Sequence, residues 1–420
     1  MNIQTKPPLT LAEQALVDGF AERLKDLPGS AAVSDLRDRL IGELKDHGLP
    51  TRRIESWHYT DFRVLLKSVP EGGNDAVRLI EPLVPEAIRL VAGADAGDLP
   101  AGLKVSDYAD ALRDGRVTTQ MEPRGADDAI GRISGAFVSC GLGLDLAAGT
   151  ALEHPVELQV AHGGGHTHQR FPVRIGANAA ATVIERHTNR GSDPAFVTSV
   201  TDLVVGNDAN LTWIIVQTQG GADTHLSQIN VTLEENARLT LYVVNAGGKL
   251  VREEIHVVAK GEGADLQLRG VNLLDGDSHT DVTLTLGHDV PNTTSTETFR
   301  NVVFDRARGV FQGQIRVAQD AQKTDARMAS NTLLLSDDGE FSTKPELEIF
   351  ADDVQCAHGA TVADIDDVHL FYLMSRGIPE PQARGLLVKA FVNEIVEELE
   401  DEPLVEALHD VIETWLERHG

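Results

Sequence analysis

Two residues with metal-ligating side chains, Cys356 and His358, lie two positions apart in an acidic segment of this 420-residue chain. In an extended strand, residues i and i+2 point to the same face, so the thiol and the imidazole would lie side by side. Both are good ligands for iron, zinc or copper. Asp352 and Asp353 precede them and would add negative potential. Because protein metal sites usually need about three or four ligands, the pair predicts half of a metal site.

A second group of candidate ligands is the segment His162-Gly-Gly-Gly-His-Thr-His168. If this segment were extended, His166 and His168 would share one face and offer imidazole nitrogens to a metal. The three consecutive glycines favour a mobile, solvated loop instead, because glycine leaves the backbone poorly preorganised. We predict the loop rather than a metal site, and the sequence leaves the role of its histidines open. Cys140 lies in an apolar stretch typical of a small buried side chain, and we assign it no function.

The composition limits the class of protein before any element is placed. The chain has 65 acidic and 37 basic residues and a net charge of −28, and such a field repels nucleic-acid phosphates. No window approaches the roughly 18 consecutive apolar residues of a membrane helix, and the N-terminus lacks an apolar core of signal-peptide length. Two cysteines are too few for a disulfide framework. We therefore expect a cytoplasmic protein that binds neither nucleic acid nor membrane.

Residues 135–361 carry a repeat that would position the Cys-x-His pair. Short alternating β-type runs are separated by Gly, Asn and Asp turns, and an alanine recurs before four of these runs, at positions 179, 209, 237 and 264. These alanines are 30, 28 and 27 residues apart. A β-type repeat of this length predicts a solenoid of roughly seven to eight coils. The alternative is a β-sandwich with evenly spaced hairpins, but Asn-Gly and Asp-Gly turns are scarce here.

Helical periodicity flanks this repeat on both sides. Residues 1–134 begin with a capping box at Thr10 and Glu13, continue into two amphipathic helices and end in mixed structure. Residues 362–420 are also helical, and within them a helix begins at Pro403. Before it, apolar residues recur at four-residue spacing, at Leu387, Phe391, Ile395 and Leu399. We predict that these C-terminal helices cap the open end of the β core; the alternative is a surface for another protein.

Standard enzyme motifs are missing from the chain: there is no phosphate-binding loop, no nucleophile elbow and no H-E-x-x-H zinc helix. β-Helices also host carbohydrate lyases and esterases, which use carboxylates along one face. Asp352 and Asp353 are adjacent, so in a strand they would point to opposite faces and not flank one bond. Three classes stay open: a scaffold whose half-site another subunit completes, a carbohydrate-active β-helix enzyme, and a structural adaptor without ligand.

Several segments between residues 299 and 400 resemble the SufB/SufD family of iron–sulfur cluster assembly proteins. These are Gly309–Val317, Ala321–Asp325, Asn331–Leu335, Thr343–Thr361 and Leu370–Gly377. The Cys-x-His-Gly-Ala-Thr form that begins at Cys356 is similar to the SufD branch of that family. Arg53–Thr60 resembles the family's N-terminal Trp-x-Tyr-Thr element, with His58 where lysine is common. We expect Trp57, Tyr59 and Phe62 to anchor this segment against the core.

The resemblance implies a mainly β protein, in which a right-handed parallel β-helix lies between N-terminal and C-terminal α-helical regions. It implies a non-catalytic scaffold subunit rather than an enzyme, paired end to end with a SufB-like paralogue or, in its absence, with a second copy. A SufC-like ABC-type ATPase would dock on residues 362–420. The chain would hold no stable cofactor, only a transient iron–sulfur cluster or iron at the subunit interface. Carried over to this sequence, His358 would offer an imidazole nitrogen and Cys356 a thiolate sulfur.

Overall fold

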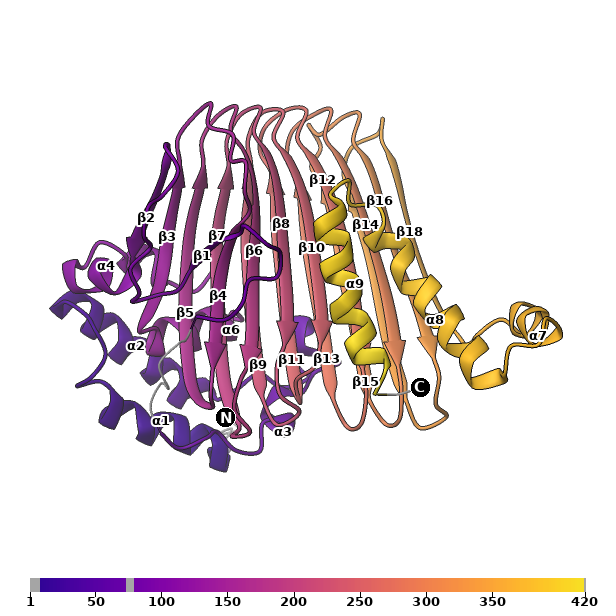
Figure 1. Ribbon diagram of the computed structural model, residues 1–420. Helices are drawn as coiled ribbons and strands as arrows, with labels where there is room; N and C mark the ends of the chain where they lie inside the picture. The colour runs from indigo at the N-terminus through magenta and orange to yellow at the C-terminus, as the bar shows by residue number, and fades with distance from the viewer. Residues whose placement is uncertain (1–7, 73–78, 419–420) are drawn as a thin grey trace.

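The computed structural model describes residues 8–72 and 79–418, and in these ranges two nine-stranded sheets form a parallel β-solenoid (Figure 1). Sheet A contains, in spatial order, β1 (Ile88–Leu90), β4 (Val156–His162), β6 (Ala180–Asn189), β8 (Asn210–Thr218), β10 (Arg238–Ala246), β12 (Asp265–Leu274), β14 (Thr294–Val303), β16 (Asp325–Leu334) and β18 (Gln355–Ala363). Sheet B contains β17 (Glu340–Ile349), β15 (Arg308–Val317), β13 (His279–His288), β11 (Leu250–Ala259), β9 (Thr224–Leu233), β7 (Ala195–Val205), β5 (Gly165–Ile175), β3 (Cys140–Leu146) and β2 (Leu103–Asp107).

Successive strands from β3 onward alternate between the two sheets, so that the chain coils around one axis. Neighbouring strands within each sheet pair in parallel, as in β10 with β12 and β11 with β13, and only β2 with β3 is antiparallel in the described chain. The predicted solenoid is therefore confirmed, and the β-sandwich alternative, which needs hairpins, is wrong. The short strands β1 and β2, from the region expected to be mixed, extend the first coils.

The recurring alanines lie at the same corner of successive coils, and all four are buried. The residue directly before each alanine has a positive φ: 58° at Asn178, 55° at Asp208, 53° at Asn236 and 74° at Gly263. Asn, Asp and Gly are the residue types that adopt this left-handed conformation most readily. The corner therefore needs a turn residue that tolerates positive φ and then a small side chain inside the coil.

The inside of the solenoid is apolar over one part of each strand and polar over another. On β6, Val183 packs into the apolar core, and Glu185 and His187 follow at two-residue spacing on the same inner face. Both are buried, and the His187 ring nitrogen Nε2 lies 2.8 Å from a Glu185 carboxylate oxygen. In later coils the polar part becomes a ladder of amides, with Asn245 donating to Asn272 and Asn272 to Asn301, each over 2.8 Å.

The N-terminal helices cover the outer face of sheet B. They are α1 (Leu11–Arg23), α2 (Ala31–His47), the 3-10 turn η1 (Glu55–Trp57), α3 (Phe62–Leu65), α4 (Tyr108–Asp114), α5 (Thr118–Met121) and α6 (Ala129–Phe137). The predicted capping box at Thr10 and Glu13 is present at the start of α1. Helix α6 contacts β5, β7 and β9, and its apolar side chains share a core with Phe196 and Leu226.

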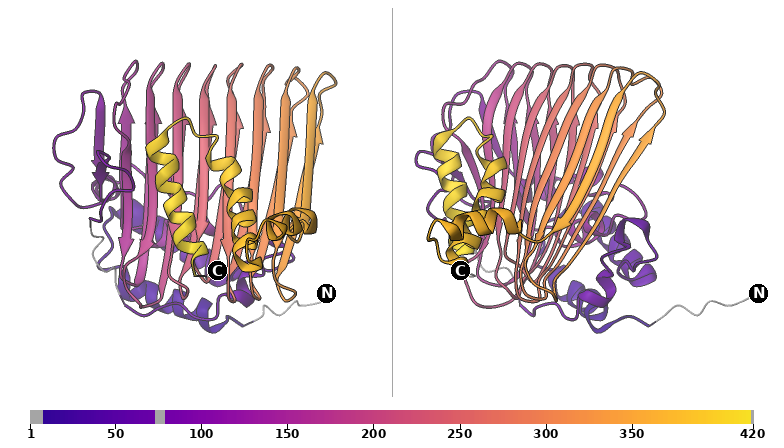
Figure 2. Two further views of the ribbon diagram at one scale, coloured as in Figure 1. Left: turned by 45° about the vertical axis from the view of Figure 1, so that its right-hand side comes forward. Right: turned by 90° about the vertical axis from the view of Figure 1, so that its right-hand side faces the viewer.

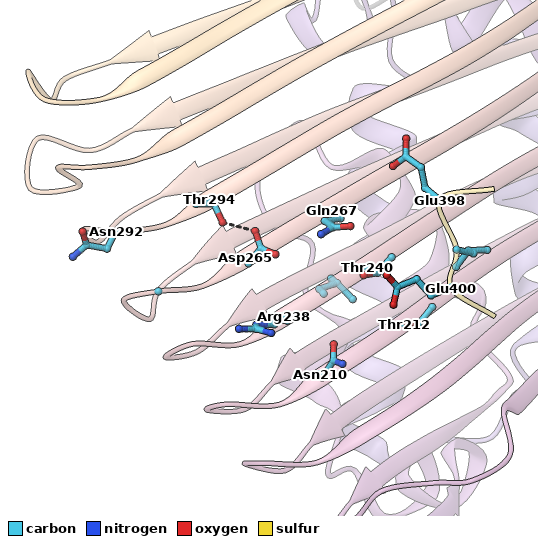
Figure 3. Close-up of a pocket in the computed structure, with 13 residues that line it drawn as sticks. Asn210, Thr212, Arg238, Thr240, Asp265, Gln267, Asn292, Thr294, Glu398 and Glu400 are labelled. Atoms are coloured by element: carbon cyan, nitrogen blue, oxygen red, sulfur yellow. Dashed lines mark hydrogen bonds between the residues drawn. The ribbon is translucent and has the colours of Figure 1, made fainter. Parts of the chain in front are cut away.

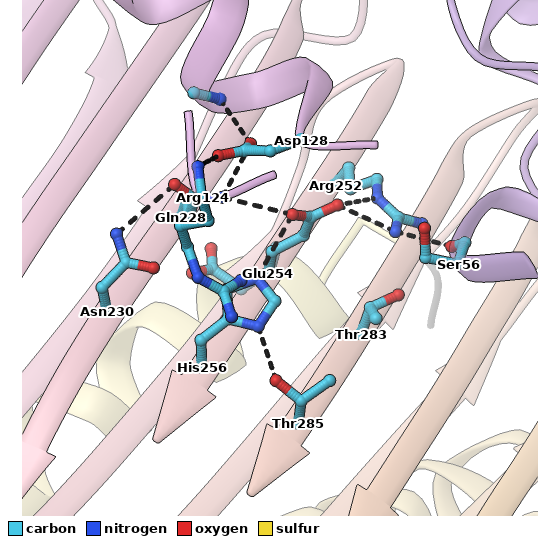
Figure 4. A network of polar contacts seen from close by, with 12 residues as sticks. Ser56, Arg124, Asp128, Gln228, Asn230, Arg252, Glu254, His256, Thr283 and Thr285 are labelled. Carbon is cyan, nitrogen blue, oxygen red and sulfur yellow. Dashed lines mark hydrogen bonds and ion pairs between the residues drawn. The ribbon is translucent and has the colours of Figure 1, made fainter. Parts of the chain in front are cut away.

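A polar network fixes the N-terminal segment to sheet B (Figure 4). The Arg252 guanidinium donates to the Ser56 carbonyl over 2.7 Å and pairs with Glu254 over 2.9 Å and with Asp281. Its carbon Cζ also lies 3.9 Å from the Trp57 ring centroid. Trp57 and Phe62 are fully buried, which confirms their anchoring role, whereas the same expectation is wrong for Tyr59, which is 37% exposed.

The C-terminal helices are α7 (Asp367–Ser375), α8 (Glu380–Val396) and α9 (Glu402–Leu416). Helices α8 and α9 lie on the opposite side of the solenoid, against the outer face of sheet A, whereas α7 packs against α8 (Figure 2). Helix α8 contacts β12 and β14, and the Tyr242 hydroxyl on β10 donates to the Ile395 carbonyl over 3.1 Å. The prediction that these helices cap the open end is wrong, because β18 stays exposed along nearly its whole length among the described residues. None of the helices in these ranges has the length and apolar character of a membrane span.

Candidate functional site

Cys356 and His358 lie on β18, the outermost strand of sheet A, in the last coil of the solenoid. Their partners across the strand pair are Ala326 and Met328 of β16, which are both buried in the solenoid core. The two ligating side chains therefore sit on the inner side of the final coil, next to each other on one face. Cys356 packs against the end of the core, whereas His358 is exposed because no further coil covers it.

The two side chains differ in how ready they are to bind a metal ion. Burial raises the pKa of the Cys356 thiol, and a smaller effect from a hydrogen bond with the Ala326 backbone lowers it. The isolated chain therefore carries a protonated thiol there, and metal binding would have to release that proton. The His358 ring makes no hydrogen bond or ion pair with other residues that the structure describes. Its two nitrogens are therefore available to an incoming ligand.

No third ligand completes the pair within the part of the chain that the structure describes. Residues 8–72 and 79–418 contain no group of three or more His, Cys, Asp or Glu side chains placed to hold a metal ion. Asp353 is engaged at the corner before β18, where its backbone N–H donates to the Gln322 side chain over 2.9 Å and its carboxylate pairs with Lys323. The acidic pair thus belongs to the turn, and Cys356 and His358 remain a half-site.

The last coil presents two unpaired strand edges, one on β17 and one on β18. Large apolar side chains around them are exposed, namely Ile349, Phe350 and Val362. A free edge of this length is a template for pairing with another chain, and exposed apolar groups mark interaction surfaces. The half-site therefore lies on a surface suited to a second protein.

A separate exposed apolar surface lies on α7, the helix that directly follows β18. Its members are Val368, Phe371, Tyr372 and Met374, and Phe371 is 72% exposed. The opposite side of the helix is fixed to the molecule by the buried side chain of Leu370. The sequence pattern did not single out this helix as a separate element, because its apolar residues surround it rather than form a stripe.

The segment from His162 to His168 is not the mobile, solvated loop that the glycines predicted. It is the corner between β4 and β5, and all three of its histidines are buried. His166 and His168 do share a face, with ring nitrogens 3.2 Å apart, and their other nitrogens reach the Pro70 carbonyl and the Thr198 hydroxyl, each over 2.9 Å. Burial, with a smaller effect of the Arg23 charge, lowers the pKa of His166 to about 4. His166 and His168 are neutral packing residues beneath the N-terminal helices, against Phe137 and Phe196. His162 lies on the inner side of the coil, with its Nε2 2.8 Å from the Gln219 side-chain oxygen.

Cys140, the first residue of β3, is a poor candidate for thiol chemistry. Burial raises the pKa of its thiol to about 11, despite a hydrogen bond from Ser139 that lowers it. Its sulfur lies 3.9 Å from the His168 carbonyl, beneath the N-terminal helical region. The thiol is therefore protonated at neutral pH, in line with its assignment to packing.

A polar groove of about 580 Å³ lies on sheet A beside the turn between α8 and α9 (Figure 3). Its carboxylates come from Asp265, Glu398 and Glu400. The Asp265 carboxylate accepts a hydrogen bond from the Thr294 hydroxyl, and Glu398 pairs with Arg269 over 2.6 Å.

A carbohydrate-active enzyme would need a carboxyl with a raised pKa facing its substrate. Burial raises the pKa of Glu253 and of Glu297 to about 8, but these two carboxyls face the inside of the solenoid. A substrate in the surface groove would not reach them. The described residues therefore give the lyase or esterase alternative no support.

Comparison with known proteins supplies the family context of this geometry. Residues 158–391, which run from β4 to α8 and include Cys356 and His358, match the family model described as SUF system FeS cluster assembly, SufBD core domain. The chain is 30% identical over 379 residues to the iron-sulfur cluster assembly protein SufD of Escherichia coli, covering 87% of this chain and 88% of that protein. It is 26% identical over 418 residues to a SufBD family protein of Synechocystis, covering 93% and 90%. It is also 26% identical over 409 residues to the chloroplastic protein ABCI7 of Arabidopsis thaliana, covering 91% and 86%.

Proposed function

The chain belongs to the SufBD family of iron–sulfur cluster assembly proteins, and we propose that it acts there as a non-catalytic scaffold subunit that supplies ligands to a cluster built between two chains. The observation that carries this proposal is the half-site of Cys356 and His358 on the open last coil. A structural metal site usually has four ligands and a catalytic one three, whereas the open last coil supplies two, so a second chain has to supply the others. The cluster is thus cargo rather than a cofactor of this chain.

Each side chain has a distinct role in this proposal. His358 offers a neutral imidazole nitrogen to iron, and its exposed position allows it to meet iron as the cargo arrives. Cys356 offers sulfur once its proton has been released, and it is already oriented by packing against the core. The remaining ligands come from the chain that covers the last coil.

The proposed covering chain is a SufB-like paralogue that pairs with the open edges of β17 and β18. Pairing would extend each sheet across the boundary between the two solenoids and bury Ile349, Phe350 and Val362. A second copy of this chain carries the same edges, so it would form a homodimer when the paralogue is absent. In both cases the half-site ends up inside the interface.

A replacement of His358 tests the site assignment directly. We expect His358→Ala to lower cluster maturation in cells by at least about tenfold, since removing even an outer-shell partner of a metal site weakens it by about 10–100-fold. Cys356→Ser is expected to have a smaller effect in the same direction, because a hydroxyl is a poorer ligand for iron than a thiolate. The measurement is the activity of a cluster-dependent reporter enzyme, with assembly of the complex followed by co-purification.

The matched control for that experiment is His154→Ala, which removes a surface histidine far along the chain from the last coil. It should mature clusters like the wild type. If His358→Ala and Cys356→Ser both matured clusters at the wild-type level, in complexes that assemble normally, the assignment of these residues as ligands would be wrong. The chain would then be the structural adaptor without ligand.

The proposed second partner is a SufC-like ABC-type ATPase that docks on the C-terminal helical region, residues 362–420. The exposed side chains of α7 form an apolar surface that is separate from the strand edges, so one chain would bind both partners at once. ATP binding would draw two ATPase copies together and move the helices on which they dock. That movement would open the interface around Cys356 and His358 to iron and sulfide.

A charge in the middle of this apolar surface tests the docking site. We expect Phe371→Asp to weaken retention of the ATPase by about thirtyfold or more, because a central aromatic contact contributes about 2 kcal/mol or more to binding. The measurement is co-purification from cells that express both proteins. Leu11→Asp, which changes an exposed apolar residue on α1, serves as the control and should retain the ATPase. Equal retention by both variants would exclude α7 as the docking site.

A further inference from the structure

A row of polar side chains crosses the outer face of sheet A and ends on the strand that carries the half-site. Arg300 on β14, Asn331 on β16 and Thr361 on β18 are direct partners in the register of these three strands. At the inner end of the row, Glu394 of helix α8 lies 2.6 Å from the Arg300 guanidinium. The row thus joins α8 to the outermost strand, β18. Figure 1 shows where these two elements lie in the fold.

The hydrogen bonds along the row all have a defined direction. One Arg300 nitrogen, Nη2, donates to Glu394, and the other, Nη1, donates to the side-chain amide oxygen Oδ1 of Asn331. The Asn331 amide nitrogen then donates to the Thr361 hydroxyl over 2.8 Å. Because Asn331 uses its acceptor toward Arg300 and its donor toward Thr361, its amide cannot turn over without losing both bonds.

Each end of the row is attached to its own element, α8 at one end and β18 at the other. On the helix side, the Arg300 carbon Cζ also lies 5.0 Å from the Phe391 ring, so the guanidinium follows α8 through two contacts. On the strand side, Thr361 is three residues after His358, which corresponds to about 10 Å along an extended strand. β18 has a neighbouring strand on one side only, so its position depends on β16 and on such side-chain contacts.

We infer that Arg300 and Asn331 are positioning residues that transmit displacement of α8 to β18 and thereby set the placement of His358 and Cys356. The inference rests on the proposed function, since it needs an ATPase that moves the C-terminal helices. A shift of α8 that carries Glu394 away leaves Arg300 to follow it or to release it. If Arg300 follows the helix, the amide of Asn331 loses the bond that fixes its orientation, and its bond to Thr361 on the edge strand is weakened. If Arg300 releases Glu394, the row is cut at the helix and β18 is no longer tied to α8.

A neighbouring ion pair links the C-terminal helices to sheet A without a connection to β18. Glu398, directly beyond the end of α8, lies 2.6 Å from Arg269 on β12. The other hydrogen bonds of Arg269 go to the carbonyls of Leu268 and Thr296 and to the Thr296 hydroxyl. They end on β12 and β14 and do not reach β16 or β18. This second pair therefore holds the helices to the sheet without a path to the half-site.

Hydrogen exchange on the full chain alone tests the row. We expect Glu394→Gln to speed exchange of the backbone amides of residues 355–363 by about two- to fivefold, the range for a partly exposed ion pair. Asn331→Ala is expected to speed it by about fivefold or more, because it removes two hydrogen bonds. The matched control Glu398→Gln should leave these amides like the wild type. If the backbone amides of residues 355–363 exchanged at the same rate in all three variants, the inference would be overturned.

A second measurement separates transmission from simple support of β18. In the complex with the ATPase, a non-hydrolysable ATP analogue should change the exchange of residues 355–363 in the wild type and in Glu398→Gln. It should leave that exchange unchanged in Asn331→Ala, although the same variant still binds the ATPase. An equal response in Asn331→Ala would overturn transmission through the row. Failure of the ATPase to bind the wild-type chain would instead overturn the proposed function. Hydrogen exchange on the chain alone would still show whether the row holds β18 in place.

Discussion

The replacement Arg252→Met is expected to lower the free energy of unfolding by about 3–5 kcal/mol, because it leaves two buried carboxylates without their partner. The Arg252 side chain is fully buried between Glu254 and Asp281. Burial alone would raise the pKa of Glu254, but Arg252 and His256 outweigh it and lower the pKa to about 2. The charge on Glu254 therefore depends on the arginine, and methionine, which fills similar space, supplies no compensating charge.

The same replacement should loosen the N-terminal region in particular. Arg252 contacts both the Ser56 carbonyl and the Trp57 ring, so it links this segment to sheet B alongside Gln312, which also donates to the Ser56 carbonyl. Denaturant unfolding measures the loss in global stability, and hydrogen exchange in residues 11–65 measures the loosening. Arg174→Met removes an exposed pair with Asp145 on another strand of sheet B and should change stability by less than about 1 kcal/mol. A loss of similar size in both variants would contradict the special role of the buried network.

The second large effect is a dependence of stability on pH that arises inside the solenoid. Burial, together with the charge of Glu185, raises the pKa of Glu253 to about 8 from an ordinary value of 4.5. Burial likewise raises the pKa of Glu297 to about 8, against a smaller opposing effect of the Ser295 hydroxyl. Between these pH values the folded chain holds both protons while the unfolded chain has released them. The contribution of these two carboxyls to stability is therefore expected to fall as the pH rises from about 4.5 to 8. Buried histidines such as His166 and His288, whose pKa burial lowers to about 4, act in the opposite direction below about pH 6.5.

The size of this effect follows from the pKa difference. Each carboxyl would reduce the free energy of unfolding by up to about 3–5 kcal/mol between pH 4.5 and 8. Glu253→Gln keeps a neutral group of the same shape, so the change in the free energy of unfolding from pH 5 to pH 8, measured by denaturant unfolding, should be more favourable to pH 8 than in the wild type. Glu235→Gln, in an exposed turn, is the control and should keep the wild-type difference. An unchanged difference in Glu253→Gln would show that this carboxyl is ionised in the folded chain.

The coiled core could be predicted from sequence because its signals are local. Each corner needs a residue that accepts positive φ followed by a small one, and pairs such as Asn178-Ala179 and Asp208-Ala209 repeat that requirement in every coil concerned. The Cys-x-His spacing likewise fixed the shared face of the half-site within one strand. Both predictions depend only on residues a few positions apart, where backbone geometry decides the outcome.

The elements that were mispredicted depend on contacts far apart in the sequence. The glycines before His166 indicated mobility, yet Gly164 allows a close approach: a side chain there would lie 2.8 Å from Asp193 on the next coil. The C-terminal helices have an apolar stripe that would suit either the end or the face of the solenoid. Their place on the face is fixed by distant partners, such as Tyr242 and Arg269. No local pattern in the sequence carries that information.

The position of the half-site on the last coil has a thermodynamic consequence. In a solenoid each coil is stabilised by its nearest neighbours, so the final one has half the stacking energy of the others and frays first. Cys356 and His358 therefore lie on the least cooperative unit of the chain. A partner that stacks on this coil supplies the missing neighbour, so that ordering of the ligands and association of the subunits become a single equilibrium. Cys356 and His358 would then be held in a ligating arrangement only in the assembled state, and an unpaired chain would bind metal weakly.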